Sequence, residues 1–139
     1  MFTGNSFGKS LEILHRTMDA TTLRRRVIAD NIANADTPNF KRSDVNFEAF
    51  LKRALESEKN KPVLEMAVTD EQHIPNYRPT DYRDVAPVKY FDYLSTTDNN
   101  GNNVDLEQEG MLALENQMNY ELMVSIVANQ FSQVNSVLK

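Results

Sequence analysis

Two histidines, His15 and His73, are the only side chains with ordinary proton-transfer chemistry near neutral pH, and the sequence contains no cysteine. His73 lies in the segment 69–74, whose oxygen and nitrogen atoms are possible metal ligands. No second histidine is close enough in sequence to complete a site, so a turn that caps its own backbone is the better interpretation. His15 lies beside the apolar side of an expected helix, where a surface or partner-facing histidine is more common than a ligand. We therefore predict no metal and no cofactor.

Clusters of charged residues offer two other kinds of chemistry. Asp81, Asp84 and Asp92 could supply the carboxylate pair of a glycosidase, but scattered aspartates in a loop-rich acidic chain are usually solvated. The run 24–26 is three arginines and could bind phosphate, yet such residues on an acidic protein more often form ion pairs with a neighbouring chain. The chain also lacks the HExxH, GxSxG, GxGxxG and phosphate-loop patterns. An enzyme is therefore not predicted.

Length and charge narrow the class of protein further. The chain has 139 residues, of which 40% are hydrophobic and 25% charged, so we expect a single domain over residues 1–139. A net charge of −5 argues against nucleic-acid binding, which needs a surplus of basic residues. Residues 1–8 lack the pattern of a cleaved secretory signal, and no stretch has the roughly 20 apolar residues of a membrane span. Residues 1–34 carry a net +2 and residues 104–139 a net −4, so the two ends have opposite charge.

Glycine and proline are absent between Gly8 and Pro38 and again after Gly110. We therefore predict a helical segment at each end of the chain, over residues 8–35 and 104–139. In the first helix, residues recur at alternating spacings of three and four, as in a coiled-coil seam: Leu11, Leu14, Met18, Thr21, Arg25, Ile28, Ile32 and Ala35. Thr21 and Arg25 are weak seam residues. A different helix that offers a carboxylate therefore suits this seam better than a second copy does, and the acidic C-terminal helix is one candidate.

The C-terminal helix carries two neighbouring apolar stripes. The first has the same seam spacing and consists of Tyr120, Val124, Val127, Phe131, Val134 and Leu138. The second consists of Met111, Leu114, Met118, Leu122 and Ile126. Together they form a face wider than one partner helix can cover, so we expect more than one neighbour to pack on this helix.

The middle third of the sequence contains most of the prolines and is expected to be irregular. A short third helix is predicted with Asn46 as its N-cap and a polar end over residues 57–61, on the spacing of Phe47, Phe50, Leu51, Ala54 and Leu55. The apolar runs 63–66, 74–77 and 85–94 suggest short strands or extended arms. Residues 96–103 have the composition of a turn or flexible loop. The predicted fold class is thus mainly α, with paired terminal helices and a middle segment that is irregular or short β.

The segment 29–42 specifies how the first helix ends. Asn31 and Asn34 are three residues apart, so their amides can share one face and reach the last unpaired carbonyls or a neighbouring chain. Thr37 precedes a proline and is pushed out of the helical region, so the helix must stop by then. Asn39 tolerates a left-handed turn, after which Phe40 can fold back as an apolar anchor. A well-capped helix and turn would explain these features, but not the concentration of small and amide side chains.

This segment resembles the signature of bacterial flagellar axial proteins, the rod and hook family. The matching residues are Asn31, Ile32, Ala33, Asn34, Thr37, Pro38 and Phe40. The sequence departs from the signature at Asp30, where the family usually has Asn, and at Asn39, where it usually has Gly. The segments 34–38 and 44–47, the 50–55 helix and the pair His73–Ile74 are similar to proximal rod members. The far end is similar to the family's C-terminal signature at residues 103–107, Glu109, Asn116, Tyr120 and Phe131.

The resemblance implies a structural subunit of the flagellar rod, exported through the flagellar type III apparatus and polymerised in the periplasm. Its terminal helices would pair and pack around a central channel. The implied partners are other rod subunits, the rod adaptor protein and the membrane-embedded ring protein. We expect the assembly interface to comprise Leu11, Leu14, Met18, Arg25, Ile28, Ile32, Met118, Tyr120, Leu122, Val124, Val127, Phe131, Val134 and Leu138.

Three other interpretations remain open from the sequence. A helical adaptor or export chaperone, whose terminal helices pair within one molecule, would use the same seams. An enzyme acting on the cell wall ranks last, because no catalytic pair is recognisable. Another proximal rod paralogue is the nearest alternative within the family.

Overall fold

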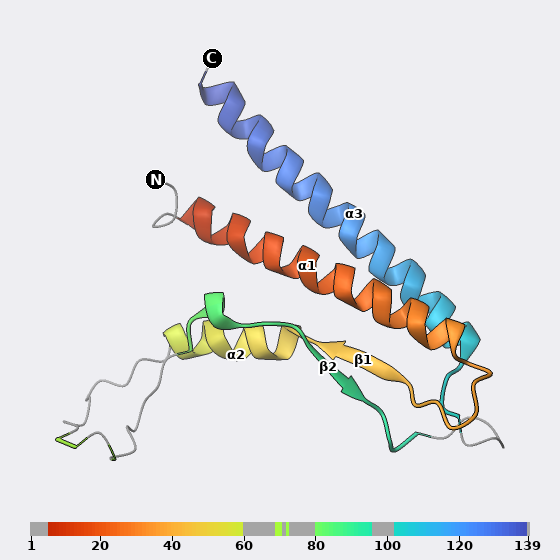
Figure 1. The fold of residues 1–139 in the computed structure, drawn as a ribbon. Helices are drawn as coiled ribbons and strands as arrows, with labels where there is room; N and C mark the ends of the chain where they lie inside the picture. Colours follow the sequence, from red (N-terminus) through yellow and green to blue (C-terminus); the bar gives the residue numbers. More distant parts are fainter. Residues whose placement is uncertain (1–5, 60–68, 71, 73–79, 96–101, 139) are drawn as a thin grey trace. The chain divides into compact units, whose positions relative to one another are not determined.

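The computed structural model describes residues 6–59, 69–70, 72, 80–95 and 102–138. Its elements are α1 (Ser6–Ala33), β1 (Ser43–Asn46), α2 (Glu48–Lys59), the 3-10 helix η1 (Tyr82–Asp84), β2 (Val88–Phe91) and α3 (Leu106–Val137) (Figure 1). The mainly helical class with long terminal helices is confirmed. The chain divides into two compact units, residues 1–45 with 87–139 and residues 46–86.

The first unit is built on an antiparallel pair formed by α1 and α3. The C-terminal end of α1 lies beside the N-terminal end of α3, as the hydrogen bond from Asn31 Nδ2 to Glu109 Oε2 (3.2 Å) shows. Near the other end of the pair, Gln130 Nε2 bonds Ser10 Oγ at 3.3 Å. The buried apolar side chains of the two helices are Ala20, Val27, Ile28 and Met123. The expected pairing of the terminal helices therefore occurs within a single chain.

A two-stranded sheet of β1 and β2 completes the first unit, and the two strands run in opposite directions (Figure 1). Ser43 and Val45 of β1 are buried and alternate with half-buried neighbours, whereas every residue of β2 is exposed. The third apolar run, 85–94, does contain a short strand, and Pro87 directly precedes it. β1 was not predicted, because its residues Ser-Asp-Val-Asn have little β-propensity and the strand depends on tertiary contacts.

The second unit contains α2 and η1. The prediction that Asn46 caps the third helix is wrong: Asn46 ends β1, and the carbonyl of Phe47 accepts the first helical hydrogen bond, from the Leu51 amide at 2.9 Å. The helix thus begins at Glu48, and Phe47 is completely buried. Ser57 links α2 to the segment before η1, since its Oγ accepts a hydrogen bond from the Thr80 amide at 3.2 Å.

Other expectations for the middle of the chain have mixed outcomes. The runs 63–66 and 74–77 lie outside the described residues, as does His73. Of the expected turn or flexible loop 96–103, residues 96–101 lie outside the described residues. Asn102 and Asn103 belong to no helix or strand, and both are buried and hydrogen-bonded. Composition suggested a loop because asparagine favours turns, but both amides here bind backbone carbonyls of other segments.

Candidate assembly surface

The end of α1 is held by its asparagines. Asn31 is completely buried; its Nδ2 donates to the Ser43 carbonyl at 2.8 Å and its Oδ1 accepts from the Ser43 amide at 3.0 Å. Asn34 acts locally, because its Nδ2 donates to the Asp30 carbonyl at 2.8 Å. Asn39 has a φ of 62°, the left-handed conformation expected for it. The signature segment therefore ends α1 and fixes the strand that follows.

A buried ion pair joins this segment to α3. The Nε of Arg42 lies 2.6 Å from Oε1 of Glu109, whose side chain is 0% exposed. Asp44 lies 3.5 Å from the Arg42 guanidinium on the other side. Burial alone would lower the pKa of Arg42, but the hydrogen bond and charge of Glu109 outweigh it, so the pKa is raised above its usual value. Arg42 is thus a fixed cation that places the first turn of α3.

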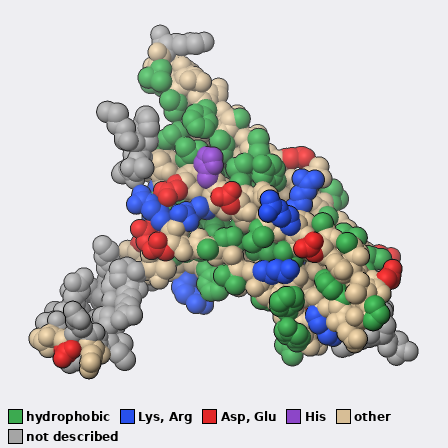
Figure 2. All heavy atoms as spheres, in the orientation of Figure 1, with side chains coloured by type: hydrophobic (Ala, Val, Ile, Leu, Met, Phe, Trp, Pro, Cys, Tyr) green, Lys and Arg blue, Asp and Glu red, His purple; other side chains and the backbone are tan. Residues whose placement is uncertain are grey.

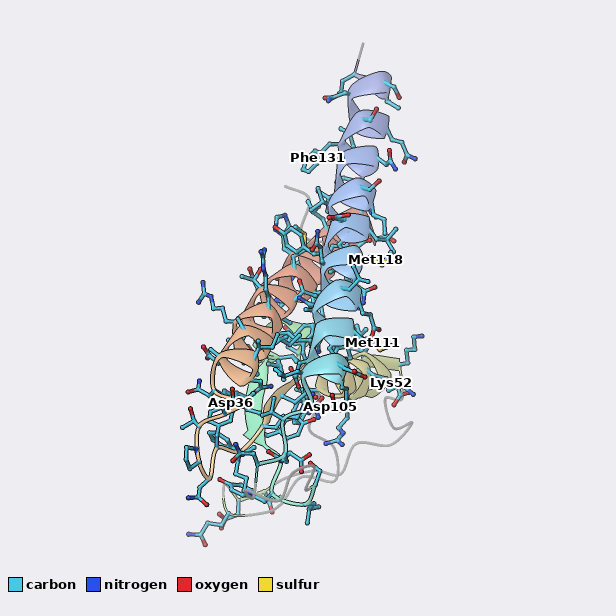
Figure 3. The ribbon with its side chains drawn as sticks, turned by 90° about the vertical axis from the view of Figure 1, so that its right-hand side faces the viewer. Asp36, Lys52, Asp105, Met111, Met118 and Phe131 are labelled. Atoms are coloured by element: carbon cyan, nitrogen blue, oxygen red, sulfur yellow. The ribbon has the colours of Figure 1, made fainter. Side chains whose placement is uncertain are left out.

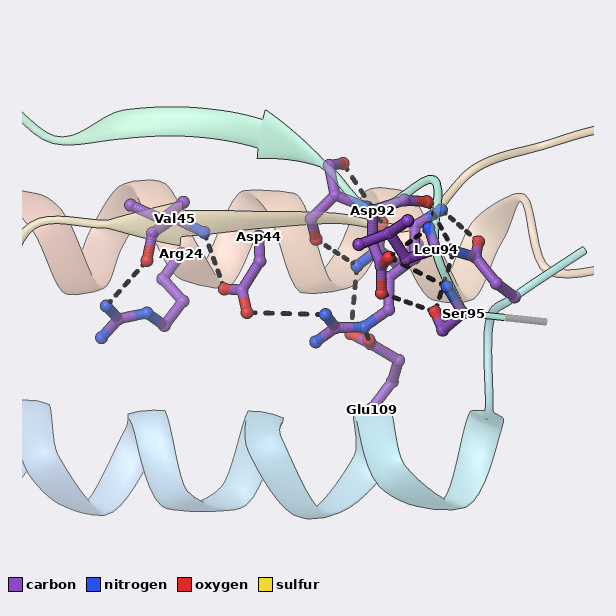
Figure 4. A network of polar contacts seen from close by, with 11 residues as sticks. Arg24, Asp44, Val45, Asp92, Leu94, Ser95 and Glu109 are labelled. Atoms are coloured by element: carbon purple, nitrogen blue, oxygen red, sulfur yellow. Dashed lines mark hydrogen bonds and ion pairs between the residues drawn. The ribbon is translucent and has the colours of Figure 1, made fainter. Parts of the chain in front are cut away.

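Backbone and amide contacts extend this cluster to the segment after β2 (Figure 4). The Arg42 amide donates to Asn103 Oδ1 at 2.6 Å, and Asn103 Nδ2 donates to the Asp92 carbonyl at 2.7 Å. The carboxylate of Asp92 accepts hydrogen bonds from the Ser95 hydroxyl and from the amides of residues 94 and 95, which lower its pKa. Asn102 donates to the carbonyls of Ala35 and Thr37, at 2.7 and 2.9 Å. The polar cluster therefore connects four separate segments of the first unit.

The inner face of α3 packs on α1 with amides at core positions. Asn116 is buried and its Nδ2 donates to the Thr21 carbonyl at 3.0 Å. The Oδ1 of Asn116 and the Oε1 of Gln130 are also buried, and neither accepts a hydrogen bond from the described part of the chain. This face contains Glu109, Asn116, Met123, Val127, Gln130 and Val134, all buried or half-buried.

The outer face of α3 is also apolar but is exposed. Met111 and Met118 lie on the side of the helix that faces away from α1, whereas Phe131 lies on the other side (Figure 3). The exposed fractions of Met111, Met118 and Leu122 are 74%, 62% and 59%. Figure 2 shows hydrophobic side chains gathered on the surface of α3 toward its C-terminus. Within the described residues, α3 therefore carries more apolar surface than α1 covers.

The residues of the expected interface fall into three groups. Ile28 is buried against the core, and Leu11, Leu14, Met18, Val127 and Val134 are half-buried. The exposed members are Arg25, Ile32, Met118, Tyr120, Leu122, Val124, Phe131 and Leu138. Among the signature residues, Asn31 is buried, Asn34 and Phe40 are half-buried, and Ile32, Ala33, Thr37 and Pro38 are exposed. The exposed members are the ones that remain available to another chain.

Sequence reasoning missed the residues that hold the cluster together. Arg42, Ser43 and Asn102 carried no spacing signal, because their partners lie far away in the sequence. Glu109, Asn103 and Asn116 belonged to the C-terminal motif of the resemblance, but the sequence assigned them no role. Glu109 lies on the same helical face as Met123 and Val127, and a charged residue in line with apolar ones is a local sign of a buried partner.

Other kinds of site receive no support from the described residues. None of the described helices has a segment apolar and long enough to cross a bilayer. Within the same residues, no three histidine, aspartate or glutamate side chains come together as a metal site. Asp81 caps η1 by accepting from the Arg83 amide at 2.9 Å, and Asp92 caps its own turn.

Comparison with known proteins places this arrangement in a family. The family model described as flagella basal body rod protein matches residues 11–41, which include the signature segment. The flagellar basal body rod protein FlgB of Borreliella burgdorferi is 43% identical over 97% of this chain and 99% of its own length. FlgB of Borrelia hermsii is 44% identical over the same shares, and FlgB of Bacillus subtilis is 31% identical over 95% of each chain.

Helical subunits of the flagellar basal body rod are thus the class to which the fold and sequence point, and this class is structural rather than enzymatic. The chain belongs to the FlgB family of flagellar basal body rod proteins. The resemblance noted in the sequence is confirmed, and it extends over nearly the full length.

Proposed function

We propose that this chain is a subunit of the proximal rod of the flagellar basal body and that it polymerises through its terminal helices after type III export. It acts in the periplasm, reaches it without a cleaved signal peptide, and packs against other rod subunits, the rod adaptor protein and the membrane ring protein. No catalysis and no small-molecule or nucleic-acid ligand enters this function.

One observation carries the proposal: α3 has apolar residues on two opposite faces, and α1 covers only one of them. The exposed residues include Met111 at 74%, Leu114 at 60% and Leu122 at 59%. Burial of a leucine or methionine side chain contributes about 1.5–3 kcal/mol, so several such residues supply a substantial driving force for association. A helix with this surface is expected in a subunit whose neighbours provide the remaining contacts.

Deletion of the gene in the source bacterium tests the role, with the basal bodies imaged by cryo-electron tomography. The rod and everything distal to it should be absent while the membrane ring remains. Complementation with the wild-type gene should restore the rod, whereas Phe131→Asp, which puts a charge on an exposed apolar position, should not. Intact rods and filaments in the deletion strain would refute the proposal.

A helical adaptor or export chaperone is the second candidate, because α1 and α3 pair within one chain. That function requires a stable monomer or dimer that stays in the cell. Detection of the chain in purified basal bodies by mass spectrometry favours the rod subunit, and its exclusive recovery with export substrates favours the chaperone.

A further inference from the structure

Two surfaces of the first unit are complementary although they lie on different sides of the same chain. We propose that the outer stripe of α3 (Met111, Met118 and Leu122) in one copy seats in the groove between α1 and α3 of a second copy. This inference rests on the proposed rod function and names the partner and the residues of one contact.

The groove has a volume of about 750 Å³. Thr22 and Arg25 line it from α1, and Leu114, Tyr120 and Glu121 line it from α3. Its lining also includes Asn116, which is 5% exposed and whose Oδ1 accepts no hydrogen bond from the described residues. A buried acceptor without a donor is unfavourable, so a partner that supplies a donor here is favoured.

The outer stripe offers matching chemistry. Met111 and Met118 project from α3 on the side away from α1 (Figure 3). Leu114 lines both the groove and the surface that carries the two methionines. The amides of Gln108 and Asn119 line the same surface as the two methionines and are donors of the kind that Asn116 lacks. Methionine is flexible and fills irregular grooves well.

Charge favours the same pairing. Arg25 is exposed and makes no ion pair within the described residues. Glu115 is exposed beside the two methionines of the outer stripe, and it too is without an ion pair in that part of the chain. When the stripe of one copy enters the groove of another, Glu115 approaches Arg25 from the partner's side. Opposite charges at the rim of an apolar contact accelerate association and fix its register.

The stripe and the groove are different surfaces, so a single contact leaves the groove of one copy and the stripe of the other unoccupied, and the contact can be head-to-tail. A head-to-tail contact repeats from copy to copy and generates a ring or an open helix, depending on the rotation between copies. A rod is an assembly of this type. The stripe and the groove on one chain are therefore expected to bind two different neighbours.

Disulfide trapping tests the contact directly, because the chain contains no cysteine of its own. Thr22→Cys marks the groove and Met118→Cys marks the stripe, and the two full-length variants are mixed at high concentration under mild oxidation. We expect a mixed dimer of Thr22→Cys with Met118→Cys. A control variant, His15→Cys, is also exposed on α1 but does not line the groove, and should not cross-link to Met118→Cys. Self-linked Met118→Cys dimers as the main product would overturn the proposal, as would equal trapping of the control.

Charge reversal provides an independent measurement by sedimentation velocity. Arg25→Glu alone and Glu115→Arg alone should each associate roughly tenfold more weakly at low salt, since each places like charges together. An equimolar mixture should recover wild-type association, because each contact then pairs opposite charges between copies. Salt near 1 M should remove the difference, because screening shortens the reach of charges to about 3 Å. A mixture as weak as either variant alone would refute the contact.

Failure of this inference is distinguishable from failure of the rod function. A wild-type chain that stays monomeric at millimolar concentration would overturn the self-contact, yet the deletion strain would still lack rods. Intact rods in the deletion strain would instead refute the function and leave the cross-linking result unaffected.

Discussion

Loss of the Glu109 carboxylate is the perturbation to which the first unit should be most sensitive. Its side chain is 0% exposed and contacts Arg42, which keeps only 14% exposure and has Asp44 as its other carboxylate at 3.5 Å. Removing one partner of a buried ion pair costs about 3–5 kcal/mol. Because Arg42 retains some solvent and Asp44, we expect Glu109→Ala to lower the free energy of unfolding by the smaller figure, about 3 kcal/mol. Glu109→Gln keeps the shape and one acceptor and should cost about 1–2 kcal/mol.

Urea unfolding followed by far-ultraviolet circular dichroism measures these changes at fixed pH and salt. Glu107→Ala is the matched control, because it removes the same charge from an exposed position in the same first turn of α3. It should cost only a few tenths of a kcal/mol, the usual contribution of an acidic residue near a helix N-terminus. A double-mutant cycle with Arg42→Met isolates the pair itself. If Glu109→Ala lowers the free energy of unfolding no more than Glu107→Ala does, or if the cycle gives no coupling energy between Glu109 and Arg42, the ion pair does not stabilise the first unit.

Three further changes probe the turns and caps. Asn39→Gly should raise the thermal midpoint and add about 0.5 kcal/mol, because glycine adopts a φ of 62° without strain. Asp105→Ala should cost about 1 kcal/mol in urea unfolding, since Asp105 caps α3 by accepting from the amides of residues 107 and 108 at 2.9 and 3.2 Å. Ser95→Ala should raise the pKa of Asp92 toward 3.8, as followed by carbon-detected NMR titration, because the Ser95 hydroxyl is the main cause of its low value.

Each of these has a control and a contrary outcome. Asn39→Ala should destabilise where Asn39→Gly stabilises, and equal effects would exclude left-handed strain as the cause. Asp105→Asn should retain most of the cap, so a loss as large as that of Asp105→Ala would contradict the capping argument. For Asp92, the folded pKa is lowered, so its stabilising contribution exists above the unfolded pKa and is lost as pH falls through the folded one. If the difference in unfolding free energy between the wild type and Ser95→Ala is the same in acid as at neutral pH, this explanation is wrong.

The long helices could be predicted from the sequence because their signals are local. The predicted helices 8–35 and 104–139 rest mainly on the stretches 9–37 and 111–139, which contain no glycine or proline, and their bounds agree with α1 and α3 to within about two residues. Asn39 was correctly expected to be left-handed. The start of α2 was misplaced because Asn46 is a good N-cap by type, whereas pairing in the sheet retains it in β1. The preference of asparagine for an N-cap position is worth about 1 kcal/mol. The contacts that keep Asn46 in β1 outweigh this preference.

The polar cluster could not be predicted from spacing at all. Arg42 and Glu109 are separated by 67 residues, and Asn31 and Glu109 by 78. Periodicity reports which residues share a face of one helix, but it contains no information on which polar group of another segment will meet them. For the same reason periodicity did not show that Asn116 and Gln130 occupy positions of α3 against α1, whereas Tyr120, Val124 and Phe131 of the expected seam are exposed.

The polar side chains between α1 and α3 explain how the pair can have one defined register although some of its buried polar atoms lack partners. Glu109, Asn116 and Gln130 fall on heptad positions of α3 and meet Asn31, Thr21 and Ser10 in an antiparallel order. A shift of register would separate all three contacts at once, so polar core residues specify one alignment. Two of these amides leave a buried oxygen without a donor in the described residues, which makes the seam weaker than an apolar one of equal length. The polar contacts therefore fix the register of the pair, and the proposed assembly would add stability by packing further surfaces on α3.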